Sequence, residues 1–272
     1  MNVASDHTCT PPVVLVHGWG STYERTWGGS DLERTLEQDG RRIIRVDLLG
    51  HGTSRAPHES GEYAHMADEL AEHLPDDTAV DGVGFSLGGK LLLQLAAEQP
   101  QRFRRLVIAG VGDNLLRPEN GAAVAQALHA GITDDTAAAL RPVLAEALAS
   151  GNDPQALAAA IQRPPSLLTA HQLHTIGAEV LLAVGDRDVI AGVADQVSAA
   201  IPHLAGIVLE GVDHVSTPHS PRLQMAAAQF LQHGNATTEV LASSPGAPRI
   251  EHTAAGPGQV SRPAASTLDL PG

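Results

Sequence analysis

A serine flanked by glycines is the first residue in this chain that could do chemistry. Ser86 stands in the string Gly-Phe-Ser-Leu-Gly-Gly, after the apolar run 79–85 and before the helical pattern 87–98. A tight strand–turn–helix needs glycines beside the serine, because larger side chains would collide there. The turn aims the hydroxyl away from the strand, at a helix N-terminus whose dipole favours negative charge. Ser86 is therefore predicted to be a nucleophile.

The hydroxyl of a serine is a poor nucleophile until a base takes its proton, so a histidine is needed. His214 is favoured by position, because it follows the last apolar run, 207–209, in a loop that can reach the strand end carrying Ser86. Three other histidines lie in helical or linking segments, and these are His171, His174 and His203. His214 is predicted to be the base.

The imidazole in turn needs a carboxylate that holds its tautomer and stabilises its protonated form. Asp186 and Asp188 both follow the apolar run 180–184. Asp188 is favoured, because Asp186 is nearer the strand end and better placed to brace the loop. Asp113, which follows another apolar run, is a third candidate. The resulting chain order of Ser, Asp and His is one that serine hydrolases use.

Negative charge that develops on a substrate oxygen needs backbone donors nearby. One predicted donor is the amide of Leu87, the first residue of the helix after the serine. The second is the amide of Trp19, in a loop whose paired glycines let the backbone turn inward. His17, at the start of that loop, is expected to bond loop backbone and not to touch substrate.

Short apolar runs rich in β-branched residues alternate with longer amphipathic segments. The apolar runs lie at 13–16, 43–46, 79–85, 106–109, 180–184 and 207–209, and the helical patterns lie at 31–38, 63–74, 87–98 and 222–232. Apolar strands that alternate with helices indicate an α/β fold with a doubly wound, mostly parallel sheet buried on both faces. Right-handed crossovers bring the C-terminal strand ends to one edge, where ligands bind.

Two regions interrupt this alternation. Residues 114–174 have no strand pattern and are rich in Ala and Leu, which predicts three or four short helices. We expect them to form a small cap over the ligand-binding edge, although helices packed beside the sheet would have the same pattern. Residues 235–272 contain few aliphatic side chains and are expected to be a disordered tail. The core then comprises residues 1–113 and 175–234.

The composition limits the possible partners. The 272 residues are 43% apolar, and the formal net charge of −14 disfavours nucleic acid or an anionic membrane as a partner. The N-terminal stretch has neither a basic start nor an apolar run, and no segment is apolar enough to span a membrane, so a cytoplasmic protein is expected. Cys9 is the single cysteine and is expected to be inert.

Five short strings look like those of one enzyme family. They are HGWG at 17–20, DLLGHGTS at 47–54, GFSLGG at 84–89, GDRD at 185–188 and DH at 213–214. Together they resemble the α/β-hydrolase superfamily, in particular its capped esterase and C–C hydrolase branches, over Pro12 to Gln232. The resemblance implies the same triad and oxyanion donors. It also implies a structural part for the 47–54 loop, with no catalysis by His51.

The chain departs from that family pattern in two respects. The segment before Val13 is too short for the N-terminal hairpin of larger members, so six or seven strands are expected and not eight. The nucleophile is a serine, whereas relatives that open epoxides or cleave carbon–halogen bonds resemble one another in using aspartate. Neither of those activities is expected here.

These residues predict hydrolysis of a carboxylic ester through an acyl-enzyme, with no metal or organic cofactor. No helical His/Asp ligand spacing and no Walker or dinucleotide glycine pattern occurs. The expected partner is a small-molecule ester, small to medium and mostly apolar, and the protein is expected to be a monomer or homodimer. Three alternatives stay open: a C–C hydrolase with Lys90 or Arg187 on a substrate carboxylate, an acyltransferase or thioesterase, and a ligand sensor with little turnover.

Overall fold

Six parallel strands form a single sheet in the computed structural model, which describes residues 10–234. The strands are β1 Val13–Val16, β2 Ile43–Val46, β3 Val80–Phe85, β4 Phe103–Ala109, β5 Glu179–Gly185 and β6 Leu204–Leu209. Their order is β2-β1-β3-β4-β5-β6, and every neighbouring pair is parallel. The strand order reverses between β1 and β3, and open α/β sheets bind ligands beyond the strand ends at such a point.

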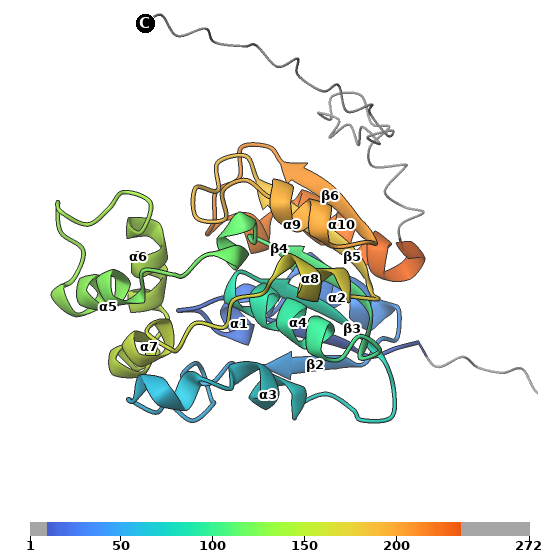
Figure 1. The fold of residues 1–272 in the computed structure, drawn as a ribbon, viewed down its shortest axis with the longest axis horizontal. Coiled ribbons are helices and arrows are strands. Elements are labelled where there is room, and N and C mark those ends of the chain that lie inside the picture. The colour runs from blue at the N-terminus through green and yellow to red at the C-terminus, as the bar shows by residue number, and fades with distance from the viewer. Residues whose placement is uncertain (1–9, 235–272) are drawn as a thin grey trace, which may run out of the picture.

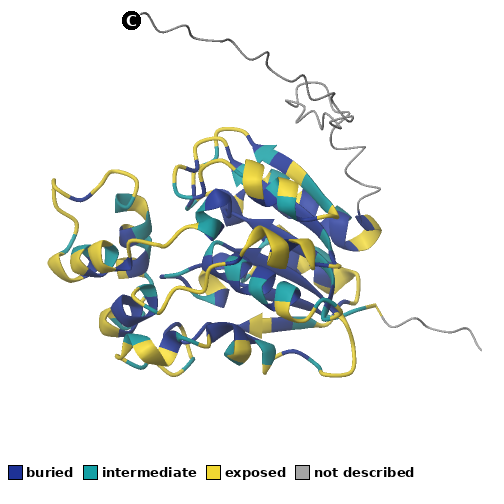
Figure 2. Ribbon diagram, viewed as in Figure 1, coloured by how far each residue is buried: buried dark blue, intermediate teal, exposed yellow. Residues whose placement is uncertain are grey.

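The side chains of each strand alternate between two apolar layers. In β1, Val14 and Val16 belong to one layer, whereas Val13 and Leu15 belong to the other. The first layer is closed by α3 Met66–Ala71, α4 Leu87–Glu98, α8 Ala170–His174 and α9 Asp195–Ala200, and the second by α1 Tyr23–Thr26, α2 Asp31–Gln38 and α10 Pro221–His233. Figure 2 shows the buried sheet between them. The predicted doubly wound fold class is confirmed.

A helical insertion separates β4 from β5. It contains the 3₁₀ turn η2 Asp113–Leu116 and the helices α5 Gly121–Ala130, α6 Arg141–Ala149 and α7 Pro154–Ile161. These three helices share a small apolar cluster of their own and stand apart from the helices on the sheet faces, at the left of Figure 1. The next helix, α8, also lies within the predicted range 114–174, but it packs against α4 and α9. The helical group therefore ends near Ile161, and we call α5–α7 the cap.

Most predicted elements are present with similar bounds. The helix predicted over 63–74 is wrong at both ends, since α3 covers only Met66–Ala71. The buried Tyr63 ends a separate 3₁₀ turn, η1 Ser60–Tyr63, and its hydroxyl donates to the carbonyl of Pro57 at 2.6 Å. After α3 the chain tightens, with Leu74 N–H bonded to Ala71 C=O. Helices α1 and α9 were not predicted, because elements of fewer than two turns show no hydrophobic period.

Cys9 and the predicted tail 235–272 lie outside the described residues. Within residues 10–234, no helix is long and apolar enough to cross a membrane.

Candidate active site

Ser86 lies at the turn between β3 and α4, in a backbone conformation that is unusual for a side-chain-bearing residue. Its φ is +50° and its ψ is −113°, and it is the one non-glycine residue with positive φ in the described part of the chain. Such strain costs free energy and persists only where the surroundings impose it. The turn projects the serine hydroxyl beyond the end of β3, near the switch point of the sheet.

The glycines beside Ser86 are required by close packing. A Cβ atom on Gly84 would lie 2.7 Å from the Cα of Gly89, and one on Gly88 would lie 2.5 Å from the carbonyl oxygen of His17. Both obstacles are backbone atoms, so they cannot move aside as a flexible side chain would. The turn is therefore tight in the way that the sequence predicts.

The structure brings Ser86, His214 and Asp188 together in one chain of hydrogen bonds. His214 Nε2 lies 3.0 Å from Ser86 Oγ, and His214 Nδ1 lies 2.8 Å from Asp188 Oδ2. With the Nδ1 proton directed at the carboxylate, Nε2 accepts the proton of the serine hydroxyl. Asp188 and His214 are 4% and 8% exposed, so little water competes for these bonds. The arrangement can transfer a proton from Ser86 to His214.

The two other acidic candidates have different partners. Asp186 accepts a hydrogen bond from the amide of Gly211 at 2.7 Å, which ties the loop after β5 to the loop after β6. Asp113 accepts the amides of Gln196 and Val197 and so caps the first turn of α9. Of the three carboxylates, Asp188 is the one that contacts His214.

The loop after β1, residues 17–22, lies directly beside Ser86, and we call it the oxyanion loop after the donor predicted at Trp19. A Cβ on Gly18 would be 3.3 Å from Ser86 Cβ, which shows how closely the two backbones approach. The predicted donor Trp19 lies next along this loop and lines the same cavity as Ser86 and Leu87. Leu87 is the first residue of α4, so its amide has no partner within the helix.

Two buried histidines fix the backbone around this loop. His17 Nε2 accepts the amide of Leu48, and His51 Nε2 accepts the amide of Gly20, each at 3.0 Å. Burial lowers the pKa of His17 to about 4 and that of His51 to about 3. Both rings are therefore neutral at pH 7, and each Nε2 can accept a hydrogen bond from a backbone amide. The structure gives both histidines backbone partners, which the sequence analysis expected for His17.

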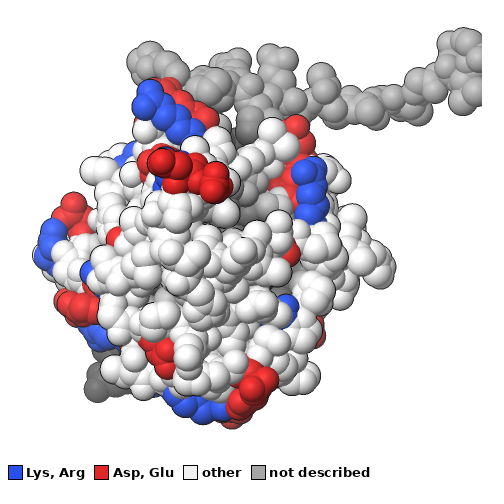
Figure 3. Space-filling view, turned by 90° about the vertical axis from the view of Figure 1, so that its left-hand side faces the viewer, with Lys and Arg blue, Asp and Glu red and all other residues white. Residues whose placement is uncertain are grey.

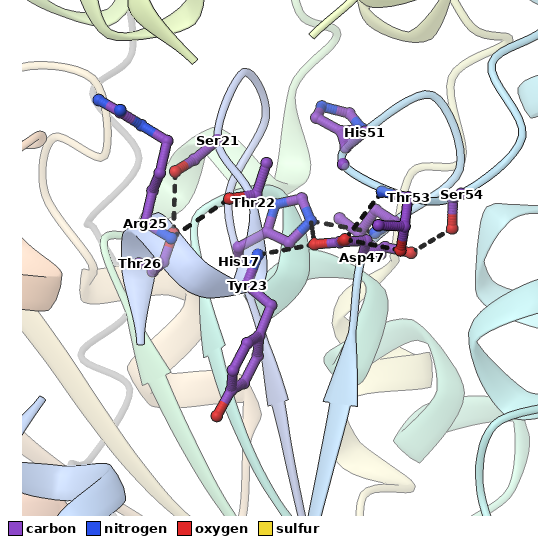
Figure 4. Close-up of polar contacts among 12 residues, drawn as sticks. His17, Ser21, Thr22, Tyr23, Arg25, Thr26, Asp47, His51, Thr53 and Ser54 are labelled. Atoms are coloured by element: carbon purple, nitrogen blue, oxygen red, sulfur yellow. Dashed lines mark hydrogen bonds and ion pairs between the residues drawn. The ribbon is translucent and has the colours of Figure 1, made fainter. Parts of the chain in front are cut away.

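Asp47, directly after β2, joins the oxyanion loop to the 47–54 loop. Its carboxylate accepts the amides of Tyr23 and Thr53 at 2.8 and 2.9 Å, and its carbonyl accepts the hydroxyl of Ser54 at 2.6 Å (Figure 4). Sequence reasoning did not single out this residue. The available signal was its place at the head of the DLLGHGTS string, immediately after a strand end.

A cavity of about 460 Å³ is lined by both Ser86 and His214. The cap and its adjoining residues contribute aliphatic side chains to the wall, namely Ala123, Val124, Leu140, Val143 and Ile161. Figure 3 shows the cap side of the molecule, where charged side chains lie mainly towards the rim and the centre is uncharged. The cavity therefore suits a substrate with aliphatic parts.

One wall of the cavity carries an ion-pair network. Glu119 bridges Lys90 and Arg163, with nitrogen–oxygen distances of 2.7 and 2.9 Å. Burial opposes ionisation of Glu119, but the two cations outweigh it and hold the pKa of this carboxyl below its usual value. Lys90 is thus paired with Glu119, although this single carboxylate balances only one of the two cations. Arg187, the other cation considered for a substrate carboxylate, is exposed and does not line the cavity.

A sequence model of the family described as alpha/beta hydrolase fold matches residues 11–163. The match covers more than half of the 272 residues and includes β1–β4, Ser86 and the cap helices. The chain belongs to the α/β-hydrolase fold family. The resemblance to the α/β-hydrolase superfamily is confirmed. Among residues 10–234 of this α/β hydrolase, no group of three or more His, Cys, Asp or Glu side chains is placed to hold a metal ion.

Two similar curated proteins carry the name pimeloyl-[acyl-carrier protein] methyl ester esterase. The one from Nitrosospira multiformis is 33% identical over 116 residues, which is 40% of this chain and 42% of that protein. The one from Aromatoleum aromaticum is 37% identical over 133 residues, or 47% and 50% of the two chains. The matched part of this α/β hydrolase thus spans about half the length of these relatives.

Solved structures of other proteins share the fold. A hydrolase from Pseudomonas aeruginosa has a TM-score of 0.64 at 22% identity, covering 82% of this chain and 90% of that one. The enol-lactonase from Burkholderia xenovorans has a TM-score of 0.61 at 20% identity, covering 84% and 94%. MenH from S. aureus has a TM-score of 0.65 at 18% identity, covering 83% and 95%. At these identities the likeness concerns the fold of the α/β hydrolase.

Proposed function

We propose that this protein is a serine esterase that hydrolyses carboxylic esters through an acyl-enzyme intermediate. The observation that carries the proposal is the hydrogen-bonded chain from Ser86 through His214 to Asp188, at 3.0 and 2.8 Å. Membership of the α/β-hydrolase fold family supports it, and so do two relatives whose names describe ester cleavage. Because those matches span about half of each relative, we extend only ester cleavage to this chain.

In the acylation step, Ser86 Oγ attacks the ester carbonyl carbon while its proton passes to His214 Nε2. Asp188 stabilises the imidazolium that forms. The carbonyl oxygen becomes an oxyanion, which accepts hydrogen bonds from the amides of Trp19 and Leu87. When the tetrahedral intermediate collapses, the bond to the alcohol breaks and the imidazolium proton goes to the leaving oxygen.

In the deacylation step, His214 takes a proton from water, and the resulting hydroxide attacks the acyl carbon. Collapse of the second tetrahedral intermediate breaks the bond to Ser86 Oγ, which regains its proton from His214. The acid product then leaves.

The aliphatic wall of the cavity favours a small to medium, mostly apolar substrate. A cytoplasmic location and a monomeric or homodimeric state stay predictions from the sequence.

The test is hydrolysis of p-nitrophenyl esters of increasing chain length by the wild type and by Ser86→Ala. Loss of the nucleophile is expected to lower kcat by at least several hundred-fold, since other parts of such a site still give about 10³- to 10⁴-fold catalysis over water. The preferred chain length indicates how long an acyl chain the cavity accommodates. Equal activity of the two proteins would contradict the proposal, and absence of turnover by the wild type would favour a C–C hydrolase or a sensor.

A further inference from the structure

The cap is bonded directly to the oxyanion loop. The indole nitrogen of Trp19 donates a hydrogen bond to the carbonyl of Leu157 in α7, at 2.9 Å. The Trp19 ring also packs against two apolar clusters, one on the sheet and one inside the cap. The residue whose amide is the proposed oxyanion donor thus has its side chain held by the cap.

A second bond joins the same two parts. Asn152 lies between α6 and α7, and its Nδ2 donates to the carbonyl of Ser21 at 3.0 Å. Its Oδ1 accepts the amide of Gly52 at 2.7 Å. One amide side chain from the cap therefore bridges the loops after β1 and β2.

The backbone of the loop also lies against the cap without space between them. Gly20 has a φ of +79°, and a Cβ on it would lie 2.7 Å from the Cβ of Ala147 in α6. Further along, Arg25 pairs with Glu146 of α6 at 2.6 Å, where both side chains are more than a third exposed. Contacts with the cap thus occur at Trp19, Gly20, Ser21 and Arg25.

We propose that Trp19, through its indole, and Asn152 are positioning residues through which the cap holds the oxyanion loop in its working geometry. The inference rests on the proposed esterase function. An oxyanion donor works only within a narrow range of distances, about 2.7–3.1 Å from the charged oxygen. A displacement of about 1 Å at a reacting centre can cost about 100-fold in rate. Loss of either bond to the cap frees the loop to shift on that scale.

A purely structural role for these bonds predicts a different result. They would then attach α5–α7 to the rest of the molecule, and their loss would lower the thermal midpoint while kcat stayed constant. Binding of a boronic acid separates the two roles, because its tetrahedral adduct on Ser86 places an oxygen where the oxyanion forms. A change in boronate affinity therefore reports on the oxyanion donors and not on general stability.

The experiment compares Trp19→Phe and Asn152→Asp with His58→Ala. Trp19→Phe keeps an aromatic ring but loses the N–H donor. Asn152→Asp keeps an acceptor for Gly52 and loses the donor to Ser21. His58 pairs with Asp153 at 2.7 Å. His58→Ala therefore removes a contact between the cap and the segment that contains His58, without changing the oxyanion loop.

Each of the first two variants is expected to lower kcat on a p-nitrophenyl ester about tenfold or more, with KM changed less than about threefold. Boronate affinity should fall by a similar factor. His58→Ala should match the wild type in both. If Trp19→Phe does not fold, Asn152→Asp decides the question, because Asn152 is only half-buried.

Unchanged kcat and boronate affinity in folded variants would overturn the inference, provided that Ser86→Ala abolishes turnover. Activity that survives in Ser86→Ala would overturn the esterase proposal itself, and the inference with it. The two failures are therefore distinguishable.

Discussion

The two sides of Ser86 are held in place by different kinds of contact. On the side of β1 and β2, the oxyanion loop is fixed by residues from distant parts of the chain, including His51 and Asn152. On the side of β5 and β6, the two loops are held by each other and by the segment after β4, where the amide of Asp113 donates to the carbonyl of Val193 at 2.7 Å. Asp188 Oδ1 accepts the amides of Ile190 and Ala191, two and three positions further along.

This difference separates the groups proposed to transfer the proton from the loop proposed to position the oxyanion donor. The loop after β6 presents His214, the proposed acceptor of the Ser86 proton, and the loop after β5 presents the carboxylate that orients it. Neither of these bonds involves the cap. The oxyanion loop presents a backbone amide, whose direction depends on everything packed around it. We therefore expect changes on the β5/β6 side to remove the reaction, and changes on the β1/β2 side to misalign it.

The largest effect is expected for Asp188→Asn. The asparagine leaves the imidazole without a charged partner and favours the wrong tautomer, so kcat should fall by about 10⁴. Asp186→Asn and Asp113→Asn serve as controls and should stay within about tenfold of wild type, because neither carboxylate contacts His214: Asp186 accepts a backbone amide, and Asp113 accepts backbone amides and the side chain of Gln196. Ester hydrolysis by the three variants decides the comparison. A larger loss in either control would reassign the acid.

The next largest effect is expected when the oxyanion loop, on the β1/β2 side, is displaced from Ser86. In Gly18→Ala, the new methyl would lie 2.9 Å from the Phe85 ring and 3.3 Å from Ser86 Cβ, so the oxyanion loop must move away. A fall of about 100-fold in kcat is expected, with the fold retained. Gly61→Ala is the matched control, because its methyl would meet open space. Wild-type kcat in Gly18→Ala would contradict the proposed place of the oxyanion donors.

Buried His17, on the β1/β2 side, is also expected to make the free energy of unfolding depend on pH. Folded His17 stays neutral down to about pH 4, because burial lowers its pKa, whereas the unfolded chain binds a proton near pH 6.5. Between these values the unfolded state holds more protons, so stability falls as the pH falls. The loss should be on the order of 3 kcal/mol for this residue. The free energy of unfolding, measured with denaturant at several pH values, should fall less steeply with falling pH in His17→Gln than in the wild type. The same dependence on pH in both proteins would contradict the assignment.

The smallest effect is expected for exposed apolar side chains that line the cavity on the β5/β6 side. Val189 and Val193 line the cavity yet are 73% and 64% exposed. Replacing both with serine should lower kcat/KM about threefold for long-chain esters and leave short-chain esters unchanged, since apolar contact with the substrate is lost. Met225→Ser, an exposed site away from the cavity, is the control. An equal loss for short and long chains would show that the rim is part of the reacting site.

The sequence indicates one side of the site better than the other for a physical reason. Asp188 and His214 lie in the loops that follow β5, which ends at Gly185, and β6, which ends at Leu209. Local pattern and parallel topology therefore suffice to bring them to one edge. The bond from Trp19 to Leu157 joins residues 138 positions apart, and its acceptor is a backbone carbonyl that any residue could supply. No local pattern encodes such a contact. The same limit applies to the extent of the inserted helices: residues 114–174 were predicted as one group, whereas α8 packs against α4 and α9.

The most direct test of the central claim is labelling with a fluorophosphonate, followed by mass spectrometry of the whole protein and of its peptides. The account predicts a single adduct on the peptide that contains Ser86, no adduct in Ser86→Ala, and much slower labelling in Asp188→Asn. A label on another residue, or equal labelling of Ser86→Ala, would contradict the assignment of Ser86 as the nucleophile.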